Sequence, residues 1–87
     1  MEIKYDKKFT KNLRLRIESS QKLYRKFKER VRLFVLDSED PVLKDHQLTG
    51  DKENYRAFSI TSDIRVIYHK GKNYIYFTDI GTHKQVY

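Results

Sequence analysis

The sequence predicts a small α+β protein in which a two-helix hairpin packs on one face of an antiparallel sheet. Apolar residues recur every three or four positions between residues 6 and 37, a spacing typical of amphipathic helices. From Tyr55 onward the apolar period changes to two, which is typical of strands. A chain of 87 residues has room for one modest core, so we expect a single domain over residues 1–87.

The first half of the chain is expected to form an edge strand and two helices. Residues 1–5 alternate polar and apolar side chains, as a short strand does. Asp6 can cap a helix that runs to about Ser19–Ser20, because its carboxylate can accept hydrogen bonds from the amides of the first turn. Ser19–Ser20 then offer the cap of a longer helix that ends near Asp37. Its apolar face is expected to contain Leu23, Tyr24, Phe27, Val31, Leu33, Phe34, Val35 and Leu36.

The second half is expected to form a loop and three strands. Residues 37–41 are a polar break, and residues 42–54 form a loop anchored by Leu43 and Leu48. Strands are predicted over residues 55–60, 63–70 and 73–80, with tight turns between them. Gly81 is expected to end the third strand before a short tail. The predicted order is therefore β-α-α-β-β-β.

Positive charge is concentrated in the helical half. The chain has 19 Lys and Arg against 12 Asp and Glu, a net charge of +7, and residues 1–36 alone hold 12 against 4, a net of +8. Such a surface attracts polyanions such as RNA, although exposed helix faces can also carry these residues merely for solvation. The residues expected to contact RNA or the ribosome are Lys7, Lys8, Lys11, Arg14, Arg25 and, near the C-terminus, Lys84.

Composition excludes several classes of site. The chain has no cysteine, so it has no disulfide, thiolate metal site or cysteine nucleophile. The three histidines lack the short paired spacing of a zinc site, and the three glycines stand alone, so we expect no metal and no cofactor. No apolar run approaches the roughly 18 residues of a membrane span, and the N-terminus lacks the apolar segment of a secretory signal. We therefore expect a soluble, cytoplasmic protein.

The polar residues of the second half suit RNA cleavage without a metal. This reaction removes a proton from a ribose 2′-hydroxyl, stabilises charge on phosphorus and protonates the leaving 5′-oxygen. Groups that titrate near neutrality can serve as base and acid, a guanidinium can hold the phosphate, and an aromatic ring can stack on a base. The candidates are His46, Asp63, Arg65, His83 and Tyr87.

Strand parity places two of these candidates together. Asp63 and Arg65 share one strand face and point away from the expected core face of Ile64, Val66 and Tyr68. Structural interpretations of the candidates remain open: Asp63 could cap the preceding turn, Arg65 could pair with Asp63 or Asp79 on the sheet surface, and His83 could simply belong to a turn.

Four fragments of the second half occur in a characteristic order and spacing: Asp45–Gly50 (DHQLTG), Asn54–Phe58 (NYRAF), Asp63–Tyr68 (DIRVIY) and Ile80–His83 (IGTH). Together they resemble the RelE/ParE toxin superfamily, and most closely its YafQ branch. The resemblance implies the microbial-ribonuclease-like fold of RelE. It also implies a type II toxin that cleaves mRNA, usually in the ribosomal A site, without a metal, inhibits translation and is silenced by a cognate antitoxin.

The resemblance also implies residue roles. His46, Asp63, His83 and Tyr87 match catalytic positions, and Arg65 matches the arginine that holds the scissile phosphate. Where the YafQ pattern has a histidine four residues before the aspartate, this chain has Ser59. A hydroxyl can bind phosphate but cannot titrate near neutral pH, so we expect Ser59 to assist Arg65.

The sequence leaves some alternatives open. Either His46 or Asp63 is the general base, while His83 is the expected acid. A ParE-like inhibitor that binds DNA gyrase and cuts no RNA is the main alternative function, and a simple RNA-binding module is a third. The catalytic-type residues favour the nuclease.

Overall fold

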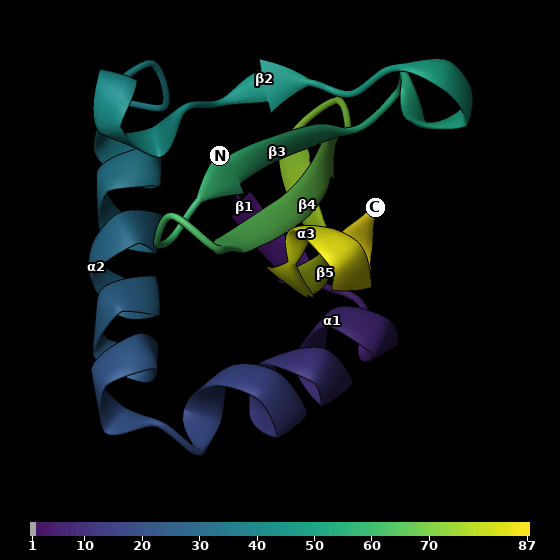
Figure 1. Cartoon of the computed structure of the whole chain (residues 1–87). Coiled ribbons are helices and arrows are strands. Elements are labelled where there is room, and N and C mark those ends of the chain that lie inside the picture. The colour runs from purple at the N-terminus through teal and green to yellow at the C-terminus, as the bar shows by residue number, and fades with distance from the viewer. Residues whose placement is uncertain (1) are drawn as a thin grey trace.

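The computed structural model describes residues 2–87 as a five-stranded sheet with two helical segments packed against it (Figure 1). The α+β class predicted from the sequence is confirmed. In chain order the elements are β1 (Glu2–Tyr5), α1 (Lys7–Leu13), the π-helical segment η1 (Arg14–Glu18), α2 (Gln21–Leu36), the 3-10 turn η2 (Pro41–Leu43), β2 (His46–Gln47), the 3-10 turn η3 (Gly50–Lys52), β3 (Arg56–Ser59), β4 (Ile64–Lys70), β5 (Tyr74–Thr82) and α3 (His83–Val86).

The sheet has the strand order β1-β5-β4-β3-β2. The strands β3 to β5 pair in antiparallel fashion, as predicted, and β2 adds to β3 in antiparallel fashion as well, whereas β1 pairs with β5 in parallel. The parallel pairing follows from the connection, because the chain leaves β1, passes through both helices and three strands, and returns along the same edge. Residues 42–54 were expected to form a loop, but His46–Gln47 within them form the short strand β2, which pairs with β3.

The last strand is longer than the sequence predicted. We expected Gly81 to end it, and this is wrong: β5 continues to Thr82, and Gly81 pairs with Arg65 of β4. The residues after it form the short helix α3 instead of an irregular tail. The β4–β5 ladder, which has one register shift between Ile67 and Tyr68, pairs Ile64 with Thr82 and so brings the start of β4 next to the start of α3.

Both predicted helix caps are confirmed. The Asp6 carboxylate accepts a hydrogen bond from the Phe9 amide at 2.7 Å, and the Ser20 hydroxyl accepts one from Leu23 at 3.2 Å. The two helical segments meet at this second cap and diverge from it, so that α1 and α2 cover different parts of the sheet (Figure 1).

The main core lies on one face of the sheet and is dominated by aromatic side chains. Phe34 of α2 stacks on Phe58 at 4.4 Å between ring centroids and meets Tyr68 edge-on at 5.0 Å. Phe9 of α1 packs edge-on against Phe77 at 5.3 Å. These contacts fix both helices to the middle strands.

A smaller apolar cluster lies on the other face of the sheet. It consists of Leu48, Ala57, Ile67 and Val86, with Tyr55 packed against it. This cluster joins the loop before β3 and the terminal helix α3 to the sheet. Leu43 and Leu48 are both buried, which confirms them as the anchors predicted for the loop.

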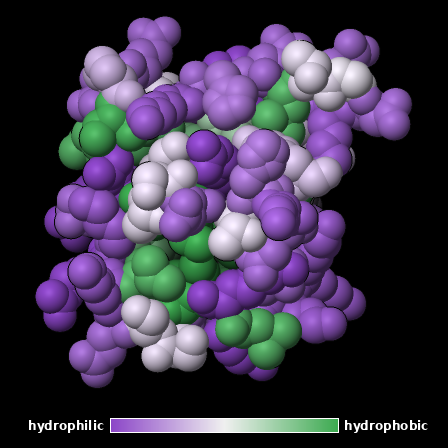
Figure 2. All heavy atoms as spheres, in the orientation of Figure 1, coloured by the Kyte–Doolittle hydropathy of each residue, from purple (hydrophilic) through white to green (hydrophobic). Residues whose placement is uncertain are grey.

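The predicted apolar face of α2 was too wide. Val35 and Leu36 are 62% and 77% exposed, because each helical residue turns by about 100° and these two follow the buried Phe34 onto the solvent side. Polar and charged side chains cover most of the face shown in Figure 2, with apolar areas between them. Within residues 2–87, no helix combines the length and the apolar character needed to cross a bilayer.

Phe34→Ala should lower the free energy of unfolding by about 3–5 kcal/mol, because it removes the ring that contacts three core aromatics. Leu36→Ala in the same helix should change it by no more than about 0.5 kcal/mol, because that side chain is exposed. Urea denaturation followed by circular dichroism measures both. Equal losses would contradict the assigned packing of α2.

Candidate functional site

The loop that carries His46 is held to the sheet by its neighbour Asp45. The Asp45 carboxylate accepts hydrogen bonds from Arg56 Nε at 2.7 Å and from the Tyr68 hydroxyl. The side chain of Asp45 is 8% exposed, so this ion pair is largely shielded from water. Burial, followed by the hydrogen bond to Asp45, raises the pKa of Tyr68 above its ordinary value. The hydroxyl therefore remains a proton donor to Asp45 at neutral pH.

His46 itself is exposed, and its ring is oriented by the backbone. His46 Nδ1 lies 2.9 Å from the carbonyl oxygen of Lys44. A carbonyl oxygen can only accept, so Nδ1 carries the hydrogen in this contact, and in the neutral ring the lone pair is on Nε2. Lys44 adopts a left-handed conformation, with φ of 50°, which turns the chain toward this carbonyl contact. The exposed nitrogen of His46 is thus available to accept a proton.

His83 and Tyr87 come from the two ends of α3. Thr82 and Gln85 form a capping box at its start, in which Gln85 Oε1 accepts from the Thr82 amide at 2.8 Å. One helical turn places the His83 and Tyr87 rings in edge-to-face contact, 4.4 Å between centroids. Burial raises the pKa of Tyr87, while the nearby Arg65 acts in the opposite direction. Tyr87 is therefore neutral at physiological pH.

Asp63 and Arg65 lie at the start of β4. The Thr61 hydroxyl accepts hydrogen bonds from the amides of Asp63 and Ile64, at 3.2 and 3.0 Å, and thereby shapes the turn. Asp63 is exposed beside this turn. Arg65 is partly buried, and its Nη1 donates to the Ser62 carbonyl at 3.1 Å. Ser59 is 6% exposed and lies directly opposite Arg65 in the β3–β4 ladder.

These candidates surround two neighbouring hollows that share His83. One hollow, of about 390 Å³, is lined by His46, His83 and Tyr87, among others. The second, of about 460 Å³, is lined by Asp63, Arg65, His83 and Lys84, among others. We call the two together the His83 groove. It gathers all four candidate catalytic residues, and its side chains offer imidazoles, a carboxylate and the three cations Lys52, Arg65 and Lys84.

The other basic candidates lie outside this groove. Lys7, Lys8, Lys11 and Arg14 are exposed along α1 and η1, and Arg25 is exposed on α2. They present positive charge to solvent on the helical side of the molecule. Ser59 is close to Arg65 but nearly buried, so of the predicted phosphate-binding pair only Arg65 has substantial access to the surface.

The sequence suggested Asp79 as a possible partner of Arg65 on the sheet surface, but the structure places it in a nearly buried cluster with Asn12 and Arg16, where it holds the strand leading to His83. This carboxylate is nearly buried and accepts hydrogen bonds from Asn12 Nδ2 at 2.7 Å and from the Ile80 amide at 2.8 Å. Arg16 Nη1 lies 3.5 Å from it and also donates to the Ile80 carbonyl at 2.9 Å. The exposed Lys8 ammonium lies 3.4 Å away. A charged residue within an apolar strand was the available signal in the sequence.

Gly81 is required by the same arrangement. A Cβ atom at this position would lie 2.5 Å from Gln85 Oε1 and 2.7 Å from Arg16 Nη1. Both groups make the hydrogen bonds that fix the backbone on either side of Gly81. Glycine therefore allows η1 and α3 to close on the end of β5.

Comparison with known proteins gives a consistent result. A family model described as "Bacterial toxin of type II toxin-antitoxin system, YafQ" matches residues 1–87. Among solved structures, the chain is similar to a mutant of YafQ from E. coli, with 25% identity, coverage of 99% of this chain and 97% of that chain, and a TM-score of 0.83. A chain of the E. coli DinJ–YafQ complex has 26% identity, coverage of 99% and 97%, and a TM-score of 0.82.

A YoeB/ParE toxin from Agrobacterium tumefaciens shares the fold, with 16% identity, coverage of 95% of this chain and 99% of that chain, and a TM-score of 0.79. No curated protein matches the sequence.

Asp79→Ala should lower the free energy of unfolding by about 3–5 kcal/mol, because it leaves Arg16 and Asn12 without their shared partner in a shielded site. Lys8→Met removes only the exposed partner and should cost less than about 1 kcal/mol. Chemical denaturation at pH 7 measures both variants. A small effect of Asp79→Ala would show that the cluster contributes little to stability.

Stability should fall at alkaline pH in part because of Tyr68. Its pKa is raised in the folded state, so the unfolded chain ionises first, and the stability present below about pH 10 is lost as the pH rises further. Tyr68→Phe should lower stability by about 1–3 kcal/mol at pH 8, because Asp45 loses a buried donor. The variant should also show a smaller decrease between pH 8 and pH 11. Urea denaturation across this range tests the prediction, and an unchanged decrease would contradict it.

Proposed function

Because the chain belongs to the YafQ family of bacterial toxins of type II toxin–antitoxin systems, we propose that it is an endoribonuclease that cleaves mRNA in the ribosomal A site. The observation that supports this function is the His83 groove, in which two hollows share one imidazole and gather His46, Asp63, Arg65 and Tyr87. A protein that acted by binding alone would not need two imidazoles, a carboxylate and a guanidinium around one site. Cleavage of the message at this position would inhibit translation and growth.

In the proposed mechanism, an RNA phosphodiester occupies the groove beside His83. The exposed Nε2 of His46 removes the proton of the ribose 2′-hydroxyl, and Asp63 is the alternative acceptor. The 2′-oxygen bonds to phosphorus while the bond between phosphorus and the 5′-oxygen breaks. His83 gives a proton to that leaving oxygen, which yields a 2′,3′-cyclic phosphate and a free 5′-hydroxyl.

Arg65 and Tyr87 complete the proposed site. The guanidinium of Arg65 stabilises the additional charge on the phosphoryl oxygens in the transition state. Ser59 lies behind Arg65 and is nearly buried, so we assign it the role of supporting the phosphate site instead of meeting RNA directly. The ring of Tyr87, held edge-on against His83, orders the neighbouring base. Side chains supply every proton transfer and the positive charge, so the proposed reaction uses no metal and no cofactor.

Ribosomal RNA and a cognate antitoxin are the proposed partners. The exposed residues Lys7, Lys8, Lys11, Arg14 and Arg25 can neutralise rRNA phosphates without selecting a sequence. The DinJ–YafQ complex from E. coli, which contains a similar chain, supports a protein partner of the antitoxin type. An acidic antitoxin segment would be attracted to the same positive surface. This function places the protein in the cytoplasm.

His83→Gln should reduce cleavage of mRNA by about 10²–10⁴-fold, because the leaving oxygen loses its proton donor. His69→Gln is the matched control: this third histidine lies on β4 outside the His83 groove, packed against Tyr55 and Tyr76, so its replacement should lower the rate far less than His83→Gln does. The assay incubates purified protein with translating ribosomes and maps message ends and their terminal phosphates.

Three outcomes would contradict the proposed function. Undiminished cleavage by His83→Gln would remove the assigned acid. Linearised plasmid formed only with gyrase, and no message cleavage by the wild type, would indicate the ParE-like alternative. Intact RNA and intact plasmid would indicate a binding protein.

A further inference from the structure

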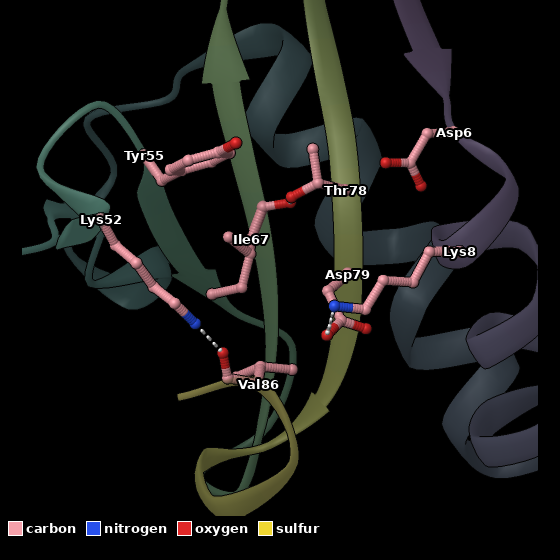
Figure 3. Close-up of a pocket in the computed structure, with 8 residues that line it drawn as sticks. All are labelled: Asp6, Lys8, Lys52, Tyr55, Ile67, Thr78, Asp79 and Val86. Carbon is pink, nitrogen blue, oxygen red and sulfur yellow. Dashed lines mark hydrogen bonds and ion pairs between the residues drawn. The ribbon is translucent and has the colours of Figure 1, made fainter.

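A separate pocket of about 300 Å³ lies on the other side of α3 from the His83 groove. Figure 3 shows it open over the strands, with side chains from α1 on one side and from η3 on the other. We call it the Tyr55 pocket, and it is lined by Asp6, Lys8, Lys52, Tyr55, Ile67, Thr78, Asp79 and Val86. Lys52 also lines the hollow that contains His46 and Tyr87, so the pocket and the groove are adjacent.

The Tyr55 pocket contains an aromatic ring fixed by its neighbours, next to apolar side chains of the sheet. Tyr55 is partly buried, packs edge-on against His69 at 5.5 Å between centroids, and rests on the cluster that contains Ile67 and Val86. Thr78 lies beside Ile67, since its hydroxyl donates to the Ile67 carbonyl at 3.2 Å. A rigid ring and a flat apolar floor favour stacking of an unpaired base. The volume is at the lower end of the range for ligand pockets, which fits one base.

Two ammonium groups flank the pocket from opposite elements. Lys52 Nζ donates to the Val86 carbonyl at 2.8 Å and so lies at the boundary with α3. Lys8 is 69% exposed, and its ion pair with Asp79 spans 3.4 Å in contact with solvent. Such an exposed pair is weak, so Lys8 can turn to an incoming phosphate at little cost. The two lysines suit the backbone of a single strand that crosses the pocket.

Two carboxylates, those of Asp6 and Asp79, line the Tyr55 pocket and influence which base it can bind. The Asp79 carboxylate already accepts hydrogen bonds from Asn12 and the Ile80 amide and forms ion pairs with two cations. Asp6 Oδ1 accepts from the Phe9 amide, and the carboxylate lies on the side of the pocket near Thr78 (Figure 3). Its remaining acceptor capacity favours a base with an exocyclic amino group over uracil.

We propose that the Tyr55 pocket binds one unpaired nucleotide of the RNA strand, next to the nucleotides that are cleaved in the His83 groove. The base stacks on Tyr55, its phosphate lies between Lys8 and Lys52, and an amino group donates to Asp6. This inference rests on the proposed function and extends it, because it makes the pocket a determinant of sequence preference. The pocket would favour adenine, cytosine or guanine at one position near the cut.

The test uses single-stranded RNA with 2′-O-methyl groups, which cannot be cleaved, lengthened by one nucleotide at a time at either end. Fluorescence anisotropy should show one addition that increases affinity about tenfold when the added base is adenine, cytosine or guanine. Tyr55→Leu should abolish this step, and Tyr55→Phe should keep it. Lys8→Met should reduce this increase in affinity, and it should lower the number of counterions released on RNA binding by about one, as measured from the salt dependence of the affinity.

Two variants serve as controls for charge and for base preference. Lys7→Met removes an equal charge from the same helix outside the pocket. It should lower the affinity for RNA of every length by the same factor and retain the roughly tenfold increase at one added nucleotide. Asp6→Asn keeps a residue that caps helices well and exchanges a carboxylate oxygen for an amide donor. It should remove the preference against uracil while the protein stays folded.

Equal affinity increments at every length, or a step that persists in Tyr55→Leu, would overturn the proposal. Unmodified mRNA is incubated in parallel with the wild type and translating ribosomes, so the two hypotheses fail separately. Cleavage without the step refutes the pocket and leaves the nuclease. A step without cleavage supports the nucleotide pocket and refutes the proposed enzyme.

Discussion

The structure depends on how the outer edge of β5 is closed after β1 has ended at Tyr5. The Asp6 amide makes the last backbone contact from this side, with the carbonyl of Phe77, and the chain then turns into α1. Beyond that point Asn12 and Arg16 replace the missing strand, since they donate to Asp79 and to the Ile80 carbonyl. Buried backbone groups must find partners, and here a helix supplies them through side chains. The final residues of β5, and with them the position of His83, are therefore set by Asn12 of α1 and Arg16 of η1.

The two faces of the sheet differ in how much apolar surface they bury and in whether they leave open pockets. One face carries the aromatic core around Phe34, Phe58 and Phe77, which provides most of the buried apolar surface. The other face carries only a small cluster, and it leaves room for the His83 groove and the Tyr55 pocket on either side of α3. A four-residue helix has no stability of its own. It is held by buried Val86, by the bond from Lys52 to the Val86 carbonyl and by the capping box at Thr82.

Local patterns in the sequence were sufficient for the caps at Asp6 and Ser20, the alternating strands after Tyr55 and the loop anchors Leu43 and Leu48, because each depends on neighbouring residues. The parallel pairing of β1 with β5 was not predictable in this way, since nothing near residues 2–5 specifies a partner 72 positions later. Gly81 was predicted to end a strand because a glycine often does so. The reason for a glycine here is its close contact with Arg16 and Gln85, which depends on the tertiary structure and cannot be predicted from neighbouring residues. For the site, strand parity grouped Asp63 with Arg65. Their approach to His83 follows from the β4–β5 register, which pairs Arg65 with Gly81.

Ser59 in place of a histidine changes what the proposed site can do as well as what it contains. Without a histidine opposite Arg65 in the β3–β4 ladder, proton transfer depends on His46 on one side of His83 and Asp63 on the other. His46 has the better local geometry for a base, because the Lys44 carbonyl holds Nδ1 and leaves Nε2 exposed. Asp63 lies in the same hollow as Arg65, where a carboxylate would offset part of the positive charge that holds the phosphate. This division favours His46 as the group that takes the proton, and it leaves Asp63 to orient Arg65 or the ribose.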